Sequence, residues 1–424
     1  MIGNDIYKFA KKLWPINRSL TGKGVRETLD EIKKILPDLV INEVPSGTKV
    51  FDWTVPKEWH INEAWIKTPS GKKICDFHKN NLHIVGYSKP IHKKMSLQDL
   101  QKNLFSIEAK ANAIPYITSY YKENWGFCIS QSDRDNLEKG EYEVFIDSKL
   151  FEGNLSYGEL LIEGEIKSEI FLSTYICHPS MANNELSGPC VTTFLAKWIS
   201  SLKKRKYSYR IIFIPETIGS VTYLSKNFKE MKKNIIAGFN VTCIGDDRKY
   251  SFLPSRNGNT LSDKAAKHVL SNISEDFVSY SWVDRGSDER QYCAPLIDLP
   301  IASIMRTKYG EYPEYHTSLD DLENVVTSKG LAGGYNALKL TIEAIEKNVC
   351  PKVTVLCEPQ LGKYDLYPSI GGPKGSKDLR NMLNLISYSD GSTDLIDIAN
   401  LCNVPIWELY KILENLESKG LLVT

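Results

Sequence analysis

The sequence predicts an α/β protein on a doubly wound, mostly parallel sheet, with a β-rich extra domain and a small helical tail. Three observations lead to this prediction. From about residue 168 to residue 350, near-continuous apolar strands alternate with amphipathic helices, as in sheets that helices cover on both faces. The region before it has short β-rich runs broken by Pro, Gly and Asn-Asn. The C-terminal part has helix-turn-helix spacing.

A chain of 424 residues exceeds one ordinary domain. We expect a helical start of the α/β domain at 1–40, a β-rich inserted domain at 41–165, the α/β domain at 166–350, a Pro/Gly-rich linker at 351–375 and a winged-helix-like domain at 376–424.

Periodicity then predicts the elements in order. Apolar residues three or four positions apart indicate helices at 5–13 and 24–36. The α/β region alternates between strands at 169–177, 209–217, 235–245 and 299–306 and helices at 188–205, 220–233, 261–273 and 328–349.

Composition excludes several classes of protein. A net charge of +1 and a pI near 7.5 predict no strong attraction to nucleic acid or anionic lipid. The first 19 residues carry charges throughout, unlike a signal peptide, and no apolar segment is long enough to cross a bilayer. The nine cysteines are scattered and form no Cys-x-x-Cys pair, which argues against a disulfide framework or a thiolate zinc site. We expect a cytoplasmic protein.

Ionisable side chains follow the predicted strands. His178 comes after the first strand, Glu216 after the second, and His316 precedes the last long helix. Function in such sheets collects at the carboxyl ends of the strands. A zinc hydrolase needs about three N or O ligands, an open position for water and a carboxylate base. His178 and His316 can supply imidazoles, Glu216 is placed to act as the base, and Asp320 or Asp321 could fix the tautomer of His316.

Four short motifs carry a resemblance to known enzymes. In chain order they are ANNELSG at 182–188, PETIGS at 215–220, GSDERQY at 286–292 and YHTSLDD at 315–321. They resemble the ligand segments of zinc aminopeptidases and glutaminyl cyclases, which have a doubly wound sheet. The order, spacing and sheet positions agree over roughly residues 168–350.

A second resemblance covers nearly the whole chain. It is carried by the motifs LWPINRSLTGKGVRETL, GTKVFDWTVPKEW, CHPSMANNELSGP, DRGSDERQY and CEPQLGKYDLYPS. They are similar to those of a bacterial family of aminopeptidase-like proteins, often labelled polysaccharide-biosynthesis proteins with an aminopeptidase-like domain. The resemblance implies a zinc-exopeptidase type of fold, an extra β domain and a C-terminal winged helix.

Three positions depart from the aminopeptidase pattern. Asn184 matches an Asp that bridges two zinc ions, Thr217 matches the second Glu of a pair, and Thr242 matches a third-strand Asp. Each anionic ligand is thus replaced by a neutral side chain. Because two zinc ions bring a charge of +4, two imidazoles and neutral groups would stabilise them poorly. We expect one zinc ion rather than two.

The expected ligand set is His178, His316 and a carboxylate, for which Glu185 is the nearest candidate and Asn184 the alternative oxygen donor. Two His and one Glu with an open position is a known zinc-peptidase set. Asp288 could be a ligand, a residue behind a ligand, or a partner of a neighbouring arginine.

Four arginines could favour a carboxylate or phosphate on the substrate, although an arginine in such a place is more often a structural ion-pair partner. They are Arg256, Arg285, Arg290 and Arg306. Residues 376–424 contain four basic residues against seven acidic ones. Such a tail would repel phosphates, so packing or dimerisation suits it better than nucleic-acid binding. Whether the chain forms a homo-oligomer stays open.

The favoured hypothesis is a zinc-dependent hydrolase of aminopeptidase-like fold that cleaves an amide bond in a small peptide or acylated metabolite. Zinc would polarise the carbonyl, and Glu216 would accept the proton of the attacking water. The alternatives are a non-catalytic binding protein on a degenerate peptidase scaffold and a winged-helix regulator.

Overall fold

The computed structural model describes residues 1–366 and 373–424. Its contacts divide the chain into two compact units. The first contains residues 1–258 and 278–336, and the second contains residues 259–277 and 337–424. No helix among the described residues is both long and apolar enough to span a membrane.

An eight-stranded sheet forms the framework of the first unit, in the order β1-β10-β12-β11-β13-β16-β14-β15. The central strands β12, β11, β13 and β16 are parallel to one another. Strands β1 and β10 pair antiparallel with their neighbours, and β14 is antiparallel to β16 but parallel to β15. The strands are β1 Val40–Pro45, β10 Asn154–Ile162, β11 Ile166–Tyr175, β12 Tyr207–Ile214, β13 Ile235–Asn240, β14 Ser251–Leu253, β15 Val278–Ser279 and β16 Ile301–Met305.

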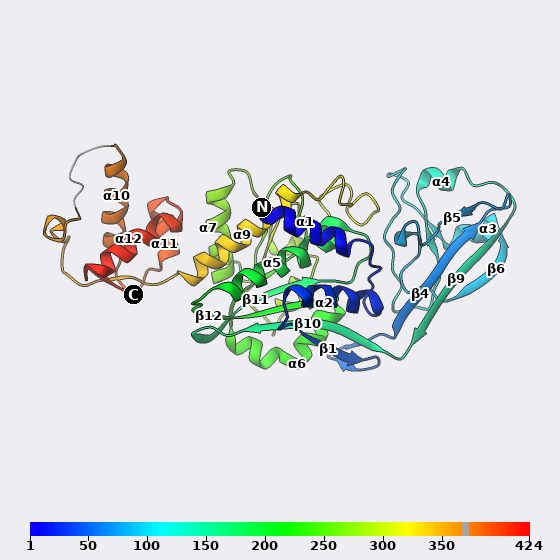
Figure 1. Cartoon of the computed structure of the whole chain (residues 1–424), viewed down its shortest axis with the longest axis horizontal. Coiled ribbons are helices and arrows are strands. Elements are labelled where there is room, and N and C mark those ends of the chain that lie inside the picture. The colour runs from blue at the N-terminus through cyan, green and yellow to red at the C-terminus, as the bar shows by residue number, and fades with distance from the viewer. Residues whose placement is uncertain (367–372) are drawn as a thin grey trace. The chain divides into compact units, whose positions relative to one another are not determined.

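Helices cover both faces of this sheet, which confirms the predicted doubly covered α/β arrangement. Figure 1 shows α1 and α5 on one face and α6 on the other. Apolar side chains from the central strands, such as Phe171, Phe213 and Phe239, are completely buried between these layers. The helices are α1 Ile2–Leu13, α2 Lys23–Ile35, α5 Ser187–Ser201, α6 Ile218–Asn234 and the short α8 Glu289–Tyr292, with a π-helix at Ala182–Leu186 and a 3₁₀ turn at Trp282–Asp284.

The parallel register places the ends of two strands together. Tyr175 at the end of β11 lies opposite Ile214 at the end of β12. The chain therefore leaves both strands at the same edge of the sheet, two or three residues before His178 and Glu216. This register brings together side chains that are 38 positions apart in the sequence.

The β-rich region has a sheet of its own, in the order β5-β4-β9-β6 and antiparallel throughout. Strands β1 and β10 also fall within residues 41–165, yet they pair with the main sheet. The other elements here are β2 Lys49–Val50, β3 Trp53–Thr54, β4 Glu58–Lys67, β5 Lys73–Ile74, β6 Ile91–Ser96, β7 Leu104–Phe105, β8 Phe127–Cys128, β9 Glu141–Phe151, α3 Leu97–Leu100, α4 Gln131–Asp135 and 3₁₀ turns at Asn81–His83 and Gln101–Asn103.

The second unit is mainly helical. Lys264 on α7 forms ion pairs with Asp394 and Asp397 beside α11, at 2.7 and 2.6 Å. Of the predicted linker 351–375, residues 367–372 lie outside the described residues, and α10 begins at Pro373. The elements are α7 Leu261–Ile273, α10 Pro373–Tyr388, α11 Leu395–Cys402, α12 Ile406–Ser418, β17 Lys352–Val353, β18 Leu422–Val423 and a 3₁₀ turn at Leu361–Tyr364; α9 Ser328–Glu346 has residues in both units.

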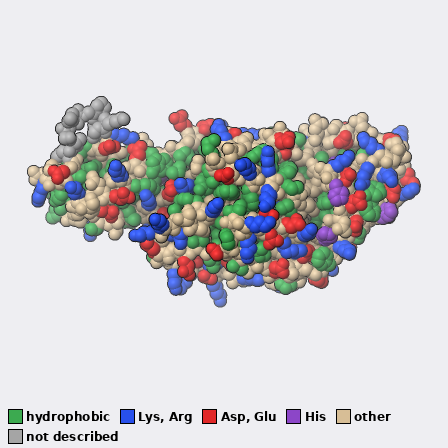
Figure 2. All heavy atoms as spheres, viewed as in Figure 1, with side chains coloured by type: hydrophobic (Ala, Val, Ile, Leu, Met, Phe, Trp, Pro, Cys, Tyr) green, Lys and Arg blue, Asp and Glu red, His purple; other side chains and the backbone are tan. Residues whose placement is uncertain are grey.

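The charges on the surface agree with the near-zero net charge. Figure 2 shows Lys and Arg side chains interspersed with Asp and Glu side chains over the visible face. A surface of this kind does not create a large field of one sign. It gives no indication of a nucleic-acid-binding face on that side.

Candidate active site

His178 lies just beyond β11, and its Nδ1 side is fully supported by buried groups. Glu185 Oε2 lies 2.8 Å from His178 Nδ1, and the other oxygen of Glu185 lies 3.4 Å from Arg18 Nε. The same Arg18 Nε donates to the backbone carbonyl of His178 at 3.1 Å. All three side chains are nearly inaccessible to solvent. The result is a buried chain from a guanidinium through a carboxylate to an imidazole.

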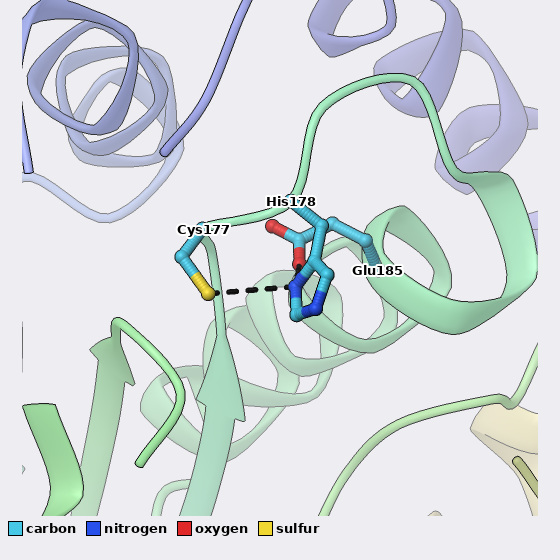
Figure 3. A group of neighbouring side chains, drawn as sticks. All are labelled: Cys177, His178 and Glu185. Atoms are coloured by element: carbon cyan, nitrogen blue, oxygen red, sulfur yellow. Dashed lines mark hydrogen bonds and ion pairs between the residues drawn. The ribbon is translucent and has the colours of Figure 1, made fainter. Parts of the chain in front are cut away.

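Figure 3 shows Glu185 and Cys177 on the Nδ1 side of the His178 ring. Cys177 Sγ lies 3.4 Å from this nitrogen. Burial alone favours the neutral imidazole, but Cys177, Tyr116 and the Glu185 hydrogen bond outweigh it and raise the pKa of His178 well above its usual range. The Nε2 atom points away from this cluster and is the nitrogen left for chemistry.

Glu216 follows β12 and stands on the Nε2 side of His178. Its Oε2 lies 3.6 Å from His178 Nε2, and its Oε1 accepts a hydrogen bond from Ser287 Oγ at 2.9 Å. The side chain of Glu216 is 22% exposed, against 6% for His178, so a small molecule would approach from the Glu216 side. Burial raises the pKa of Glu216 above its ordinary value. A carboxylate tuned upward in this way is suited to act as a general base.

Asp288 supports the turn that carries Glu216. Its Oδ1 accepts the backbone N–H of Thr217 at 2.7 Å and the hydroxyl of Ser220 at 2.9 Å, while its Oδ2 is buried without a partner. Burial, followed by the nearby Glu216, raises the pKa of Asp288 to about 8. Thr217 has a positive φ of 61°, a strained conformation that the Asp288 hydrogen bond helps to hold. Burial and the nearby Glu216 thus both favour the protonated form of Asp288.

His316 completes the cluster from the loop before α9. Its ring centroid lies 5.7 Å from that of His178 and 3.9 Å from that of Tyr315, on which it stacks. Burial, followed by the charge on His178 and then Lys110, lowers the pKa of His316 to about 3. The ring is thus neutral, and its nitrogens have no hydrogen-bond partner among the residues that the structure describes. A neutral imidazole of this kind has a nitrogen lone pair that can bind a metal ion.

The two carboxylates expected behind His316 lie elsewhere. Asp320 accepts the backbone N–H groups of Asn183 and Asn184, at 2.7 and 3.0 Å, and the Tyr312 hydroxyl at 2.8 Å. Its buried position raises its pKa to about 6. These bonds hold the loop that carries Asn184. The expectation for Asp320 is corrected because its oxygens are occupied by that loop rather than by an imidazole.

Asp321 likewise does not bond to His316. Its Oδ1 accepts the backbone N–H groups of Glu323 and Asn324, at 2.9 and 2.6 Å, and so caps the turn that follows. Asp321 therefore belongs to the local turn, not to the imidazole cluster.

Two of the three neutral replacements, Asn184 and Thr242, form one hydrogen-bonded group around Tyr175. The Tyr175 hydroxyl lies 3.0 Å from Asn184 Oδ1 and 2.5 Å from Thr242 Oγ1. The Asn184 Nδ2 atom is buried and has no hydrogen-bond partner among the described residues. Asn184 thus has its carbonyl oxygen engaged and only an amide donor free, which suits an acceptor better than a cation. The phenol of Tyr175 lies between the two side chains that match aminopeptidase carboxylates.

The four arginines differ in position. Arg290 Nη2 donates to Thr217 Oγ1 at 2.9 Å, next to Glu216. Arg256 is partly exposed and pairs with Asp298, and Arg285 lies over the Trp282 ring. Arg306 donates to the Asp246 carbonyl and lies over the Tyr250 ring. Of these four, only Arg290 contacts a residue adjacent to the candidate base.

Sequence patterns did not single out Arg18, Tyr116 or Tyr175. Arg18 lies in a loop 160 positions before His178, and Tyr116 comes from the β-rich region. Tyr175 belongs to an apolar strand, in which nothing marks it as different from a core residue. A charged residue in the loop WPINRSLTG was the one available signal, because arginines are seldom fully buried without a partner.

Two sides of His178 can be tested for a metal ion. On the Nδ1 side, ligand atoms of Cys177, His178 and Glu185 lie within 4.8 Å of one another. Burial raises the pKa of the Cys177 thiol to about 11, and the Arg18 cation lies beside Glu185. Because a cysteine binds zinc as the thiolate and a neighbouring cation repels a metal ion, this group fits zinc poorly. The contacts place Glu185 behind the imidazole, in the orienting position typical of a carboxylate–histidine–metal arrangement.

The Nε2 side offers a second position. Two imidazoles on one tetrahedral zinc have centroids roughly 5 Å apart, given Zn–N bonds of about 2 Å. The 5.7 Å between the rings of His178 and His316 is close to this separation. The Glu216 carboxylate lies on the same side of His178. On this side His178 and His316 could supply two nitrogens to a single divalent ion, with Glu216 beside them as a base rather than a ligand. The three side chains are not among the groups of described residues whose ligand atoms all lie within 4.8 Å of one another.

Comparison with known proteins assigns the chain to a family. A family model described as "Domain of unknown function (DUF4910)" matches residues 7–348, and a winged helix-turn-helix model matches residues 348–424. The chain belongs to the DUF4910 family. A Clostridium acetobutylicum relative, named "Putative polysaccharide biosynthesis protein with aminopeptidase-like domain", is 47% identical over 94% of this chain and 91% of its own.

Solved structures confirm the fold. The crystal structure of a "putative peptidase" from Clostridium acetobutylicum has a TM-score of 0.93 at 44% identity, covering 99% of this chain and 96% of that one. A zinc aminopeptidase from Bacillus subtilis has a TM-score of 0.60 at 12% identity, covering 81% of this chain and 94% of that one. The predicted aminopeptidase-like α/β fold and C-terminal winged helix are thus confirmed for this member of the DUF4910 family.

Proposed function

We propose that this protein is a hydrolase that uses one divalent metal ion, zinc by preference, to cleave an amide bond in a small peptide or an acylated metabolite. The observation that carries the proposal is the placement of the Glu216 carboxylate 3.6 Å from His178 Nε2, with the neutral His316 ring beside them. Zinc aminopeptidases share the fold, which supports the choice of metal.

His178 and His316 would hold the ion, which when bound would polarise the scissile carbonyl and acidify water. Glu185 orients His178 by accepting a hydrogen bond from its Nδ1–H group, and the Arg18 cation balances the charge of Glu185 in the buried interior. Glu216 takes the proton of the attacking water at Oε2 and passes it to the leaving nitrogen, while Ser287 holds Oε1. Neutral Asp288 supports the Glu216 turn without adding a second anion. Arg290 stands next to this turn and is the arginine best placed to meet a substrate carboxylate.

A second candidate is a non-catalytic binding protein on the same scaffold. The group formed by Tyr175, Asn184 and Thr242 favours it, because hydroxyl and amide groups stand where the aminopeptidases carry carboxylates. The retained arrangement of His178, Glu216 and His316 favours the hydrolase.

The deciding experiment measures metal content and turnover in the same protein samples. The wild type should bind about one zinc per chain, and the double variant His178→Ala/His316→Ala should bind none. Glu216→Gln should retain zinc and lose roughly 10²- to 10⁴-fold in turnover on a panel of aminoacyl amides and N-acylated amino sugars.

Glu152→Gln is the matched control, because Glu152 is 70% exposed and pairs with Lys57. A wild type without zinc, or unchanged turnover in Glu216→Gln, would overturn the hydrolase. Ligand binding by a metal-free, inactive wild type would support the second candidate.

A further inference from the structure

Contacts from other parts of the chain are needed to fix the backbone and ring orientation of His316. Its backbone has a positive φ of 55°, a conformation that L-residues other than Gly and Asn seldom adopt. Metal-binding histidines usually donate their second ring nitrogen to a carboxylate or carbonyl. No such partner of His316 is found in the part of the chain that the structure describes. Something other than a hydrogen bond to the ring must therefore set its orientation.

The support comes from residues 114–118 of the β-rich region, named here the bridging segment. Tyr116 N–H donates to the His316 carbonyl at 2.9 Å, and Ser318 N–H donates to the Ile114 carbonyl at 2.9 Å. Ile114 N–H in turn donates to Ser318 Oγ at 3.0 Å. A β-bridge between Pro115 and Thr317 lies between these bonds. The strained loop at His316 is thus paired with the bridging segment like a short strand.

The opposite edge of the bridging segment is tied into the β-rich region. Gly86 N–H donates to the Ile117 carbonyl at 2.8 Å, and Ser119 N–H donates to the Gly86 carbonyl at 2.9 Å. A side chain at Gly86 would meet Thr118 Oγ1 at 3.0 Å, so the close approach requires glycine or a small shift. The bridging segment therefore joins the β-rich region to the loop that carries His316.

The Tyr116 ring lies against both imidazoles. Its centroid is 5.0 Å from that of His178 and 5.3 Å from that of His316, which it meets edge-on at 83°. The rings of Tyr116, His178 and His316 form a triangle with sides of 5.0, 5.3 and 5.7 Å. Edge-to-face aromatic contacts of this kind have a preferred geometry, so the Tyr116 ring can fix the separation of its two neighbours.

We propose that the bridging segment is part of the active site, and that Tyr116 is the positioning residue that orients His316 toward His178. The proposal rests on the proposed function for its metal, but the orientation of His316 is a property of the protein alone. It gives the β-rich region a definite role: it completes a site whose other side chains come from the α/β framework.

The test compares Tyr116→Ala with Tyr116→Phe, which retains the ring. The first readout needs no metal: the imidazole ¹H–¹³C signal of His316, identified by its loss in His316→Gln. Tyr116→Ala should shift or broaden this signal, whereas Tyr116→Phe should leave it near its wild-type position. The second readout is zinc affinity by chelator competition, which should fall roughly 10- to 100-fold in Tyr116→Ala and stay within about threefold in Tyr116→Phe.

Tyr121→Ala is the control, because Tyr121 is five positions away, is 54% exposed and contacts Trp53 and Tyr120 rather than the imidazoles. Should Tyr116→Ala fail to fold, Ser318→Ala removes the acceptor of Ile114 N–H and should perturb the same His316 signal. An unchanged His316 signal in a folded Tyr116→Ala protein would overturn the proposal. A wild type that binds no zinc but shows the expected signal changes would overturn the proposed function and support the positioning role.

Discussion

The two histidines of the site are held in opposite ways. His178 is anchored by charge: its Nδ1 atom meets Glu185, which in turn meets the buried Arg18. His316 is anchored by packing: its ring stacks on Tyr315 and meets the edge of Tyr116, and its pKa is lowered to about 3. One site thus combines two kinds of support. Charged side chains of the α/β fold hold His178, whereas aromatic rings, one of them from the β-rich region, hold His316.

The largest expected effect comes from removing the charged support of His178. In Arg18→Met the carboxylate of Glu185 keeps its burial but loses its buried cation. Removing one partner of a buried ion pair costs about 3–5 kcal/mol. We expect a loss of this size in the free energy of unfolding, measured by urea denaturation. A loss below about 1 kcal/mol would mean that Glu185 does not depend on Arg18 for its charge.

The next effect concerns the metal-free protein, in which the two histidines should make the free energy of unfolding depend on pH in opposite directions. Because the folded-state pKa of His316 is lowered to about 3, unfolded chains bind more protons below pH 6.5 and stability is lost as the pH falls. Between pH 7 and pH 5 the wild type should lose up to about 2 kcal/mol relative to His316→Gln.

For His178 the sign is reversed, since its folded-state pKa is raised. Its contribution is present below pH 6.5 and is lost as the pH rises through the folded-state pKa. The difference in stability between the wild type and His178→Gln should therefore shrink on the alkaline side. Denaturant titrations at several pH values in the presence of a chelator measure how the stability difference between the wild type and each variant changes with pH. If this difference changes in the same direction for His178→Gln and His316→Gln, the distinction between the two histidines is removed.

The smallest effect provides the baseline. Arg256 forms an ion pair with Asp298, and the two side chains are 41% and 35% exposed. Exposed pairs contribute about 0–1 kcal/mol. Arg256→Ala should therefore change the stability by less than about 1 kcal/mol and leave zinc affinity unchanged. A large loss of substrate affinity in this variant would instead return Arg256 to the substrate site.

Hydrophobic periodicity, and the positions of ionisable residues just after the predicted strands, predicted the sheet, its covering helices and the proximity of His178 and Glu216. They succeeded because a parallel register forces the ends of β11 and β12 to one edge. They could not show which side of an imidazole Glu185 would occupy, because sequence spacing does not encode ring orientation. They also missed Arg18 and Tyr116, since contacts across 160 and 200 positions depend on tertiary packing.

The Tyr175 hydroxyl has a consequence for redesign of the protein. It lies between Asn184 and Thr242, within hydrogen-bond distance of both. Introducing an aspartate at only one of these positions would bury an anion with no cation to meet it, which is strongly unfavourable. A two-ion catalyst would need acids at both of these positions and at Thr217, together with removal of the phenol oxygen. Directed evolution by single substitutions would therefore cross unstable intermediates, whereas a designed combined replacement could bypass them.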